Sequence, residues 1–330
     1  MSFLRMTTSN HKPFLIYYEI LNYQKENIEK LHKYFNVLTL PNPEHDSVRY
    51  LKKAQVIIEP LGYYFGEEKI DLSPELKIIA SNTTGYPHID VGYATKKGIK
   101  VITLKGQSEF LDTITPTAEL AWGLIIALTR NLVPAIDSVK KGFWDRRPFG
   151  GRRMLSKMNL GIAGFGRLGS KVGNYAQSFC MNVKYYDPFV SKSPIGIEKV
   201  ETLEELVSVS DIITIHIPHE PETEKLFGKS IFSHFKPEAF LINTSRGELV
   251  DQEVLLNYLT SGKLAGAALD VFDGEFIPGF IDEMKKQALW KYAKSHQNLL
   301  ITPHIGGSTW DAWKLTEEYT IDMIINSLIV

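Results

Sequence analysis

Short apolar runs alternate with helical segments along most of the 330-residue chain, and this alternation constrains the fold more than any other feature. It is typical of parallel β-sheets that carry helices on both faces. The strand-like runs form two groups, separated by a long apolar helical segment. They cover residues 14–20, 36–40, 55–59, 76–82 and 99–104, and then 159–166, 182–187, 211–218, 239–245, 264–272 and 298–304. Because a chain of this length usually forms two domains, we expect two doubly wound α/β domains.

Composition and charge narrow the possible partners. The net charge of −1 provides no field that would draw the protein to nucleic acid or to an anionic membrane. The single cysteine excludes an internal disulfide bond and fits a reducing compartment. The N-terminus has no apolar segment of the signal-peptide kind, and the longest apolar run, residues 121–128, is too short to span a bilayer. We therefore expect a cytoplasmic protein that binds neither nucleic acid nor membranes.

The sequence GFGRLG at residues 164–169 matches the pattern G-x-G-x-x-G. It follows the apolar run 160–163 and opens a helical segment over 167–179. In such a turn the first glycine allows a tight bend, the second admits a pyrophosphate, and the third lets helix and strand pack closely. The N–H groups at the start of the helix, together with Arg167, can then bind phosphate. This context favours a dinucleotide site over the alternative, an ordinary glycine-rich turn.

Asp187 follows the next predicted strand and lies 18 residues after Gly169. In dinucleotide-binding proteins the acid that binds the adenine ribose lies about 20 residues beyond the glycines. A carboxylate there accepts hydrogen bonds from both ribose hydroxyls and repels a 2′-phosphate, so Asp187 favours NAD over NADP as the cofactor. The alternative is that Asp187 only shapes the turn in YYDP.

Three polar residues follow strands of the second group. Arg246 ends one predicted strand, Glu275 lies just past the next, and His304 ends the last. The carboxyl ends of parallel strands share one edge of a sheet, where ligands of α/β proteins bind. Histidine suits proton transfer near neutral pH, a carboxylate beside it favours the imidazolium, and arginine can grip a planar carboxylate. Beside a dinucleotide, the three residues predict hydride transfer on a small organic acid, unless each of them is only structural.

Read in order, GFGRLG, YYDP, NTSRGELVD, AGAALDVFDGE and TPHIGGST resemble the motifs of the D-isomer-specific 2-hydroxyacid dehydrogenase family, on its D-3-phosphoglycerate dehydrogenase-like side. SNTTGYPHID and TAEL match the family's substrate loop and the start of its long helix. The resemblance implies a discontinuous, flavodoxin-like substrate domain (residues 1–111 and 309–330) and a Rossmann NAD-binding domain (residues 112–308), with a cleft between them. It also implies a homodimer with the helix from Thr115 at the interface, although that helix could instead be buried within one subunit.

The resemblance also assigns roles to individual residues. His304 would be the acid/base, Glu275 its partner, and Arg246 the anchor of the substrate. The residues that would bind NAD are Gly164, Gly166, Arg167, Leu168, Gly169, Asp187, His216, Pro218, Thr244, Ser245, Arg246, Asp270, His304, Gly306 and Gly307. The substrate would be bound by Arg246 and His304 and by the loop Asn82, Thr83, Thr84 and Gly85, whose main-chain N–H groups would meet its carboxylate. No metal ion is implied.

The chain departs from the family pattern after the catalytic Glu275. Phe276 stands where the family usually has Pro, and the segment that follows, up to residue 297, is longer than usual. Asp273 could therefore replace Glu275 as the partner of the histidine, but the 29-residue spacing from Arg246 to Glu275 fits the family.

Two further departures bear on the substrate and on regulation. Residues 59–69 contain no arginine that would help to bind a phosphorylated substrate, which weighs against 3-phosphoglycerate. Because the sequence stops after its closing helix, we also expect no regulatory domain.

These features predict an NAD-dependent D-2-hydroxyacid dehydrogenase, or 2-ketoacid reductase, that acts on a small 2-hydroxy or 2-keto carboxylate. Two alternatives stay open. A corepressor-like relative of the same fold would use NAD(H) binding to control assembly and could retain all three polar residues. A formate- or phosphite-type dehydrogenase would be the other alternative, and hydride transfer from formate needs no proton acceptor at His304.

Overall fold

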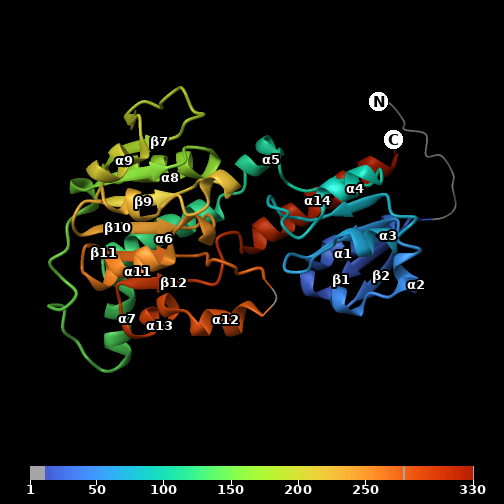
Figure 1. Cartoon of the computed structure of the whole chain (residues 1–330), viewed down its shortest axis with the longest axis horizontal. Coiled ribbons are helices and arrows are strands. Elements are labelled where there is room, and N and C mark those ends of the chain that lie inside the picture. The colour runs from blue at the N-terminus through green and yellow to red at the C-terminus, as the bar shows by residue number, and fades with distance from the viewer. Residues whose placement is uncertain (1–11, 278, 330) are drawn as a thin grey trace. The chain divides into compact units, whose positions relative to one another are not determined.

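The computed structural model describes residues 12–277 and 279–329, and the chain divides into two compact units (Figure 1). The split unit consists of residues 1–114 and 309–330, and the central unit of residues 115–308. The first boundary lies a few residues beyond the expected one, because residue 111 falls inside helix α5 (Ser108–Asp112). Residues 1–11, on which the expected lack of a signal peptide partly rests, lie outside the described residues.

The split unit contains a five-stranded parallel sheet in the order β2-β1-β3-β4-β5. This is the flavodoxin-like strand order. The strands are β1 (Phe14–Tyr18), β2 (Asn36–Leu40), β3 (Val56–Ile58), β4 (Ile78–Ala80) and β5 (Lys100–Ile102). Each predicted run contains one strand, and every strand except β2 is shorter than its run, because residues at the ends of the runs lie in the adjoining loops and helices.

Helices and hydrophobic clusters cover both faces of this sheet, since successive residues of β1 enter clusters on opposite sides. The helices are α1 (Lys25–Tyr34), α2 (Val48–Leu51), α3 (Glu67–Asp71), α4 (Val91–Lys96), α5 and α14 (Trp310–Ile329). The last helix, α14, adds Ile321 and Ile324 to one cluster. Its buried Glu317 accepts a hydrogen bond of 2.8 Å from the Asn27 side chain on α1. The C-terminal helix is therefore an integral part of the split unit.

The central unit contains a seven-stranded parallel sheet in the order β12-β11-β10-β9-β6-β7-β8. Read from β8, this is the Rossmann order with one further strand, β12, at the edge. The strands are β6 (Asn159–Ala163), β7 (Asn182–Tyr186), β8 (Ile197–Lys199), β9 (Ile212–Ile215), β10 (Ala239–Asn243), β11 (Leu264–Leu269) and β12 (Leu299–Ile301). β8 was not among the predicted runs, because a three-residue edge strand of sequence IEK has no apolar run.

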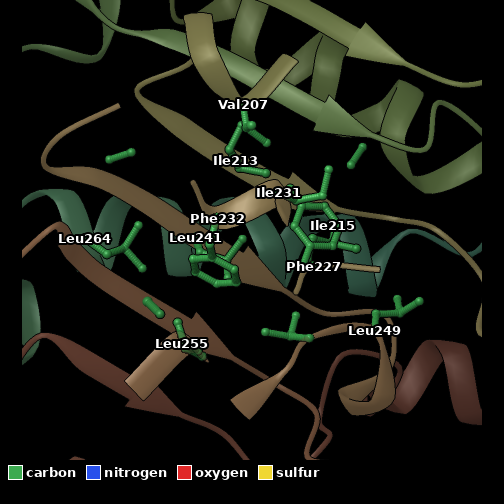
Figure 2. Close-up of a cluster of buried hydrophobic side chains, with 14 of the residues drawn as sticks. Val207, Ile213, Ile215, Phe227, Ile231, Phe232, Leu241, Leu249, Leu255 and Leu264 are labelled. Carbon is green, nitrogen blue, oxygen red and sulfur yellow. The ribbon is translucent and has the colours of Figure 1, made fainter. Parts of the chain in front are cut away.

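Figure 2 shows the hydrophobic cluster on one face of this sheet, where Val207, Phe232 and Leu255 pack against Ile213 and Leu241. A second cluster covers the opposite face. The helices of the unit are α6 (Pro116–Thr129), α7 (Leu132–Lys140), α8 (Arg167–Ser178), α9 (Leu203–Val209), α10 (Lys229–Phe232), α11 (Gln252–Thr260), α12 (Phe280–Lys286) and α13 (Ala288–Ser295). Burial on both faces explains why these strands read as continuous apolar runs.

The expected long apolar helix, from Thr115 to residue 132, corresponds to α6, and a separate helix, α7, follows it. α6 ends at Thr129, and Asn131 adopts a left-handed conformation with φ of 51° before α7 begins. Seven residues of α6 are buried, and six of them belong to the second cluster, so α6 packs within the central unit, and its role at a homodimer interface stays a prediction. Residues 108–129 are long and apolar enough to cross a membrane by length and composition, but the core position of α6 accounts for its apolar side chains.

The long segment after Glu275 forms α12 and α13. Leu289 is buried, and Phe280, Met284 and Trp290 pack against the cluster of Figure 2. The extra length therefore extends the core of the central unit rather than forming an unpaired loop.

Candidate active site

The glycine-rich turn has the geometry that its spacing predicts. Gly164 follows β6 with φ of +87°, and a Cβ there would lie 2.7 Å from the carbonyl oxygen of His216. A Cβ at Gly169 would lie 2.1 Å from the carbonyl oxygen of Gly164, so α8 can approach β6 this closely only with glycine. A Cβ at Gly166 would meet nothing within 4 Å. The middle glycine therefore borders open space, as a pyrophosphate site requires.

The start of α8 adds binding groups to this turn. Arg167 and Leu168 are its first residues and are partly exposed. The first N–H groups of a helix have no intrahelical acceptor and carry the positive end of the helix dipole. These residues fit a phosphate-binding role, with Arg167 able to supply a charge.

Asp187 follows β7 and makes more main-chain contacts than the sequence indicates. Its carboxylate accepts hydrogen bonds from the N–H groups of Phe165 (2.8 Å), Phe189 (2.8 Å) and Val190 (3.2 Å). It is 8% exposed. A carboxylate has about four lone-pair sites, so these bonds leave little acceptor capacity for a ribose. Asp187 thus shapes the turn and fixes the glycine-rich loop, which was the structural alternative, and any ribose contact comes in addition.

The strand ends next to the glycine turn carry the other expected cofactor residues. His216 follows β9, and its Nε2 lies 3.0 Å from the Thr214 hydroxyl. Burial lowers the pKa of His216 to about 4, so this imidazole is neutral at neutral pH. Pro218 is exposed, and the Ser245 hydroxyl donates a hydrogen bond to the carbonyl oxygen of Ile217. The loops after β9 and β10 are therefore joined beside the turn.

Thr244, Ser245 and Arg246 follow β10. Asn243 holds this bend, because its amide donates to the carbonyl oxygen of Arg246 (2.7 Å) and accepts from the N–H of Ser245 (3.0 Å). A Cβ at Gly247 would lie 2.1 Å from the carbonyl carbon of Phe272, so glycine lets the bend approach the segment that leads to Glu275.

The Arg246 guanidinium makes one hydrogen bond, of 2.7 Å, to the carbonyl oxygen of Ser245. Within residues 12–277 and 279–329, no carboxylate forms an ion pair with Arg246. Its side chain is only partly buried. Most of its five N–H donors are therefore available to an anionic ligand.

His304 lies just after β12 in a left-handed conformation with φ of 53°. Its Nδ1 lies 2.8 Å from Glu275 Oε1, and the side chains are 32% and 9% exposed. Because the ionised carboxylate can only accept, Nδ1–H is the donor, and Nε2 remains for proton exchange. Nε2 has no hydrogen-bond partner among the residues that the structure describes. Glu275, rather than Asp273, makes the contact with the histidine.

Asp270 follows β11 and supports the turn that contains His304. Its carboxylate accepts from the Thr302 hydroxyl (2.6 Å) and from the N–H groups of Ile305 (2.9 Å) and Gly306 (2.7 Å). It is 1% exposed. Its expected place at the nicotinamide side stays a prediction, and these hydrogen bonds give it a structural role as well. It stabilises a bend that a non-glycine residue rarely adopts.

Phe276 lies against the histidine. Its ring centroid is 5.5 Å from that of His304, with an angle of 50° between the planes. The departure from the family's Pro therefore leaves Glu275 in contact with His304 and adds an aromatic wall beside the imidazole.

The expected substrate loop, Asn82–Gly85, follows β4 in the split unit. Apart from Thr84, its residues are partly buried. Within the described part of the chain, the N–H groups of residues 82–86 have no hydrogen-bond acceptor. Five successive unpaired donors are suited to an anion such as a carboxylate.

Sequence reasoning missed the residues that hold these loops in shape. Asn243 supports the Arg246 bend, and Ser81 and His88 flank the substrate loop with buried side chains. A polar residue at the end of an apolar strand was the available signal for Asn243 and Ser81. His88 gave no such signal, because its partner is fixed only by the tertiary fold.

Glu59 follows β3 in the split unit, and its burial predicts a pH dependence of stability. It is fully buried, and neither carboxylate oxygen has a hydrogen-bond partner among the described residues. Burial raises its pKa to about 8, against a smaller opposing effect of Lys69. Between pH 5 and 8 the folded state therefore keeps a proton that the unfolded chain releases.

We expect the contribution of Glu59 to the free energy of unfolding, measured against Glu59→Gln at the same pH, to fall as pH rises through this window, by at most about 1.4 kcal/mol per pH unit. Glu59→Gln should remove the decline, and Glu75→Gln, at an exposed position, should retain it. Urea denaturation at pH 5, 6.5 and 8 measures all three proteins. Parallel curves for wild type and Glu59→Gln would contradict the expectation.

Comparison with known proteins supports the same class of site. The D-isomer specific 2-hydroxyacid dehydrogenase NAD-binding domain model matches residues 122–306. The D-3-phosphoglycerate dehydrogenase of Methanocaldococcus jannaschii is 35% identical over 267 residues, which are 80% of this chain and 48% of that protein. The hydroxypyruvate reductase of Thermotoga maritima is 35% identical over 259 residues, 78% of this chain and 80% of that protein. The chain thus spans about half the length of the first relative and most of the second.

A solved structure extends the similarity to both units. The crystal structure of D-lactate dehydrogenase from Aquifex aeolicus, complexed with NAD and lactic acid, has a TM-score of 0.80 and 28% identity. The match covers 96% of this chain and 95% of that chain.

Rossmann topology, the glycine turn and these matches define a class of NAD-dependent oxidoreductases that act on CH–OH groups. Within it, the chain belongs to the D-isomer-specific 2-hydroxyacid dehydrogenase family. Its cofactor is NAD.

Proposed function

We propose that the protein is a D-2-hydroxyacid dehydrogenase, or 2-ketoacid reductase, with His304 and Glu275 as the acid/base pair and Arg246 as the carboxylate clamp. One observation carries the proposal: His304 turns Nδ1 to Glu275 at 2.8 Å and leaves Nε2 unpaired among the described residues. A histidine oriented by a carboxylate, with its other nitrogen free, is suited to general acid/base catalysis.

Each of these residues would have a separate role in binding or catalysis. NAD, when bound, supplies the hydride donor or acceptor. Gly164, Gly166 and the start of α8 would hold its pyrophosphate. His304 would donate a proton from Nε2 to the carbonyl oxygen of the keto acid, while Glu275 stabilises the imidazolium. In the central unit, Arg246 would bind the carboxylate and orient the carbonyl. In the split unit, the unpaired N–H groups of the Asn82–Gly85 loop are suited to an anionic group of the substrate.

The substrate class follows from the segment after β3. Glu59 stands at the end of that strand, and residues 59–69 contain no arginine. We infer a substrate that is less charged or bulkier than 3-phosphoglycerate. Relatives include a hydroxypyruvate reductase and a structure with bound lactic acid, which makes unphosphorylated keto acids the first to test.

A kinetic screen tests the proposed function. NADH oxidation would be followed with 2-keto acids of graded side-chain size, and NAD reduction with the matching D- and L-hydroxy acids and with formate. We expect turnover of at least one keto acid and a preference for the D-hydroxy acid. Turnover of formate alone, retained in His304→Gln, would favour the formate-type alternative. NADH binding without any turnover would favour the corepressor-like module.

Substitutions of Asp187 test the expected preference for NADH over NADPH. Asp187→Ala should weaken NADH binding and raise the NADPH-to-NADH ratio of kcat/KM about tenfold, because the charge that repels a 2′-phosphate is lost. Asp187→Asn is the matched control, since it keeps an oxygen for the N–H of Phe165 but has no charge. It should relax the preference with a smaller loss of NADH affinity. An unchanged cofactor ratio in both variants would remove Asp187 from the ribose site.

The proposal includes a cytoplasmic homodimer that binds neither nucleic acid nor membranes. Support for self-association comes from exposed apolar side chains on α7 and just after it: Leu132, Val133, Ile136, Val139, Phe143 and Trp144. Light scattering during gel filtration would measure the state in solution. Ile136→Glu should dissociate a dimer that uses α7, and a wild-type monomer would refute it.

A further inference from the structure

We propose that Ser81 and His88 are positioning residues that set the shape of the substrate loop through a one-way chain of side-chain hydrogen bonds. The chain of bonds runs from His88 through Ser81 and Thr83 to the carbonyl oxygen of Gly85. Its effect on catalysis rests on the proposed function, whereas its effect on the loop does not.

Three contacts make up this chain of bonds. His88 Nε2 lies 3.1 Å from Ser81 Oγ, Ser81 Oγ lies 3.0 Å from Thr83 Oγ1, and Thr83 Oγ1 lies 2.6 Å from the carbonyl oxygen of Gly85. Ser81 is 1% exposed and His88 is 5% exposed, so water does not compete freely for these bonds. The two buried residues flank the loop in sequence, one directly after β4 and one before α4.

Counting protons gives the direction of each bond. A carbonyl oxygen can only accept, so Thr83 donates its single hydroxyl proton to Gly85. Thr83 then has no proton for Ser81, so Ser81 donates to Thr83. Ser81 in turn has none left for His88, so the His88 Nε2–H must be the donor. Because burial lowers the pKa of His88 to about 4, the ring is neutral and carries its single proton on Nε2, while its buried Nδ1 has no hydrogen-bond partner among the described residues. A residue that only accepts could not replace it.

The direction of the bonds makes Thr83 a support of the loop. Thr83 is held twice, because its carbonyl oxygen also accepts the N–H of Leu104 at 2.9 Å. With its hydroxyl committed to Gly85, Thr83 supports the loop rather than offering a hydroxyl proton to a ligand. The unpaired N–H groups of residues 82–86 are then fixed before a ligand arrives, which lowers the entropy cost of binding.

Steady-state kinetics measure the catalytic side of this proposal. Ser81→Ala and His88→Leu, which remove the middle and the first donor, should raise KM for the keto acid about tenfold, the effect of one lost hydrogen bond. KM for NADH should stay within about twofold, since the NAD site lies in the other unit. His88→Gln, whose amide can still donate, should stay close to wild type. Equal KM values in Leu and Gln variants would overturn the proposal.

Hydrogen exchange of the enzyme without substrate tests the loop itself. The Leu104 amide, which bonds Thr83, should exchange faster in Ser81→Ala and His88→Leu but not in His88→Gln. The Lys100 amide, bonded to Lys77 within the sheet, is the internal reference. Unchanged Leu104 exchange in Ser81→Ala and His88→Leu would overturn the proposal, even if KM rose. Faster exchange in an enzyme that turns over no keto acid would support the loop mechanism and refute the proposed function.

Discussion

Replacing His304 with glutamine should lower kcat for keto acid reduction about 10³- to 10⁴-fold. Positioned acid/base groups contribute up to about four orders of magnitude to rate, and Nε2 is the group that this histidine leaves unpaired. The glutamine amide can fill the same space and still donate to Glu275, but it cannot transfer a proton. Steady-state assays measure kcat, and titration of NADH fluorescence should show a dissociation constant within about threefold of wild type.

Glu275→Gln is the matched control for this result. Its amide oxygen can still accept Nδ1–H, but it has no charge to stabilise the imidazolium. The loss of a charge-assisted hydrogen bond corresponds to about a tenfold to hundredfold fall in kcat, smaller than that of His304→Gln. Equal activity of wild type and His304→Gln would remove the histidine from the proposed mechanism.

The strands of the sheets could be predicted because the sequence pattern of each strand lies within the strand itself. Strands such as β10 are buried on both faces and read as apolar runs, and the glycines at 164, 166 and 169 carry their steric requirements in their spacing. β8 could not be predicted in this way, because a three-residue edge strand has no pattern of its own.

In the candidate site, the sequence pattern predicted residues but not their hydrogen-bond partners. Residue types at strand ends pointed to Arg246, Glu275 and His304, but not to what their neighbours do. Asp187 bonds the N–H of Phe165, 22 positions away, and Asp270 bonds that of Gly306, 36 positions away. Such partners are set by the packed sheet, so a sequence pattern can name the acid without showing that it holds a turn.

Arg246→Gln should lower kcat/KM for the keto acid about 10²- to 10³-fold. The guanidinium has no carboxylate partner among the described residues and can form two parallel bonds to a substrate carboxylate, each worth about 1.5–3 kcal/mol. Arg246→Lys keeps the charge but not the fork, so it should recover only part of the loss. Both kcat and KM should change, because the clamp also orients the carbonyl.

A substrate without the carboxylate charge distinguishes the loss of carboxylate binding in Arg246→Gln from a general disturbance of the site. The methyl ester of the same keto acid should react poorly with wild type, because it cannot form the ion pair with Arg246. In Arg246→Gln the ratio of acid to ester activity should fall toward one, as expected when two changes remove the same interaction. An acid-to-ester ratio that stays at the wild-type value would show that Arg246 does not bind the carboxylate. Since Asn243 and Gly247 fix the bend around Arg246, a clamp in this position depends on the main chain as much as on the guanidinium.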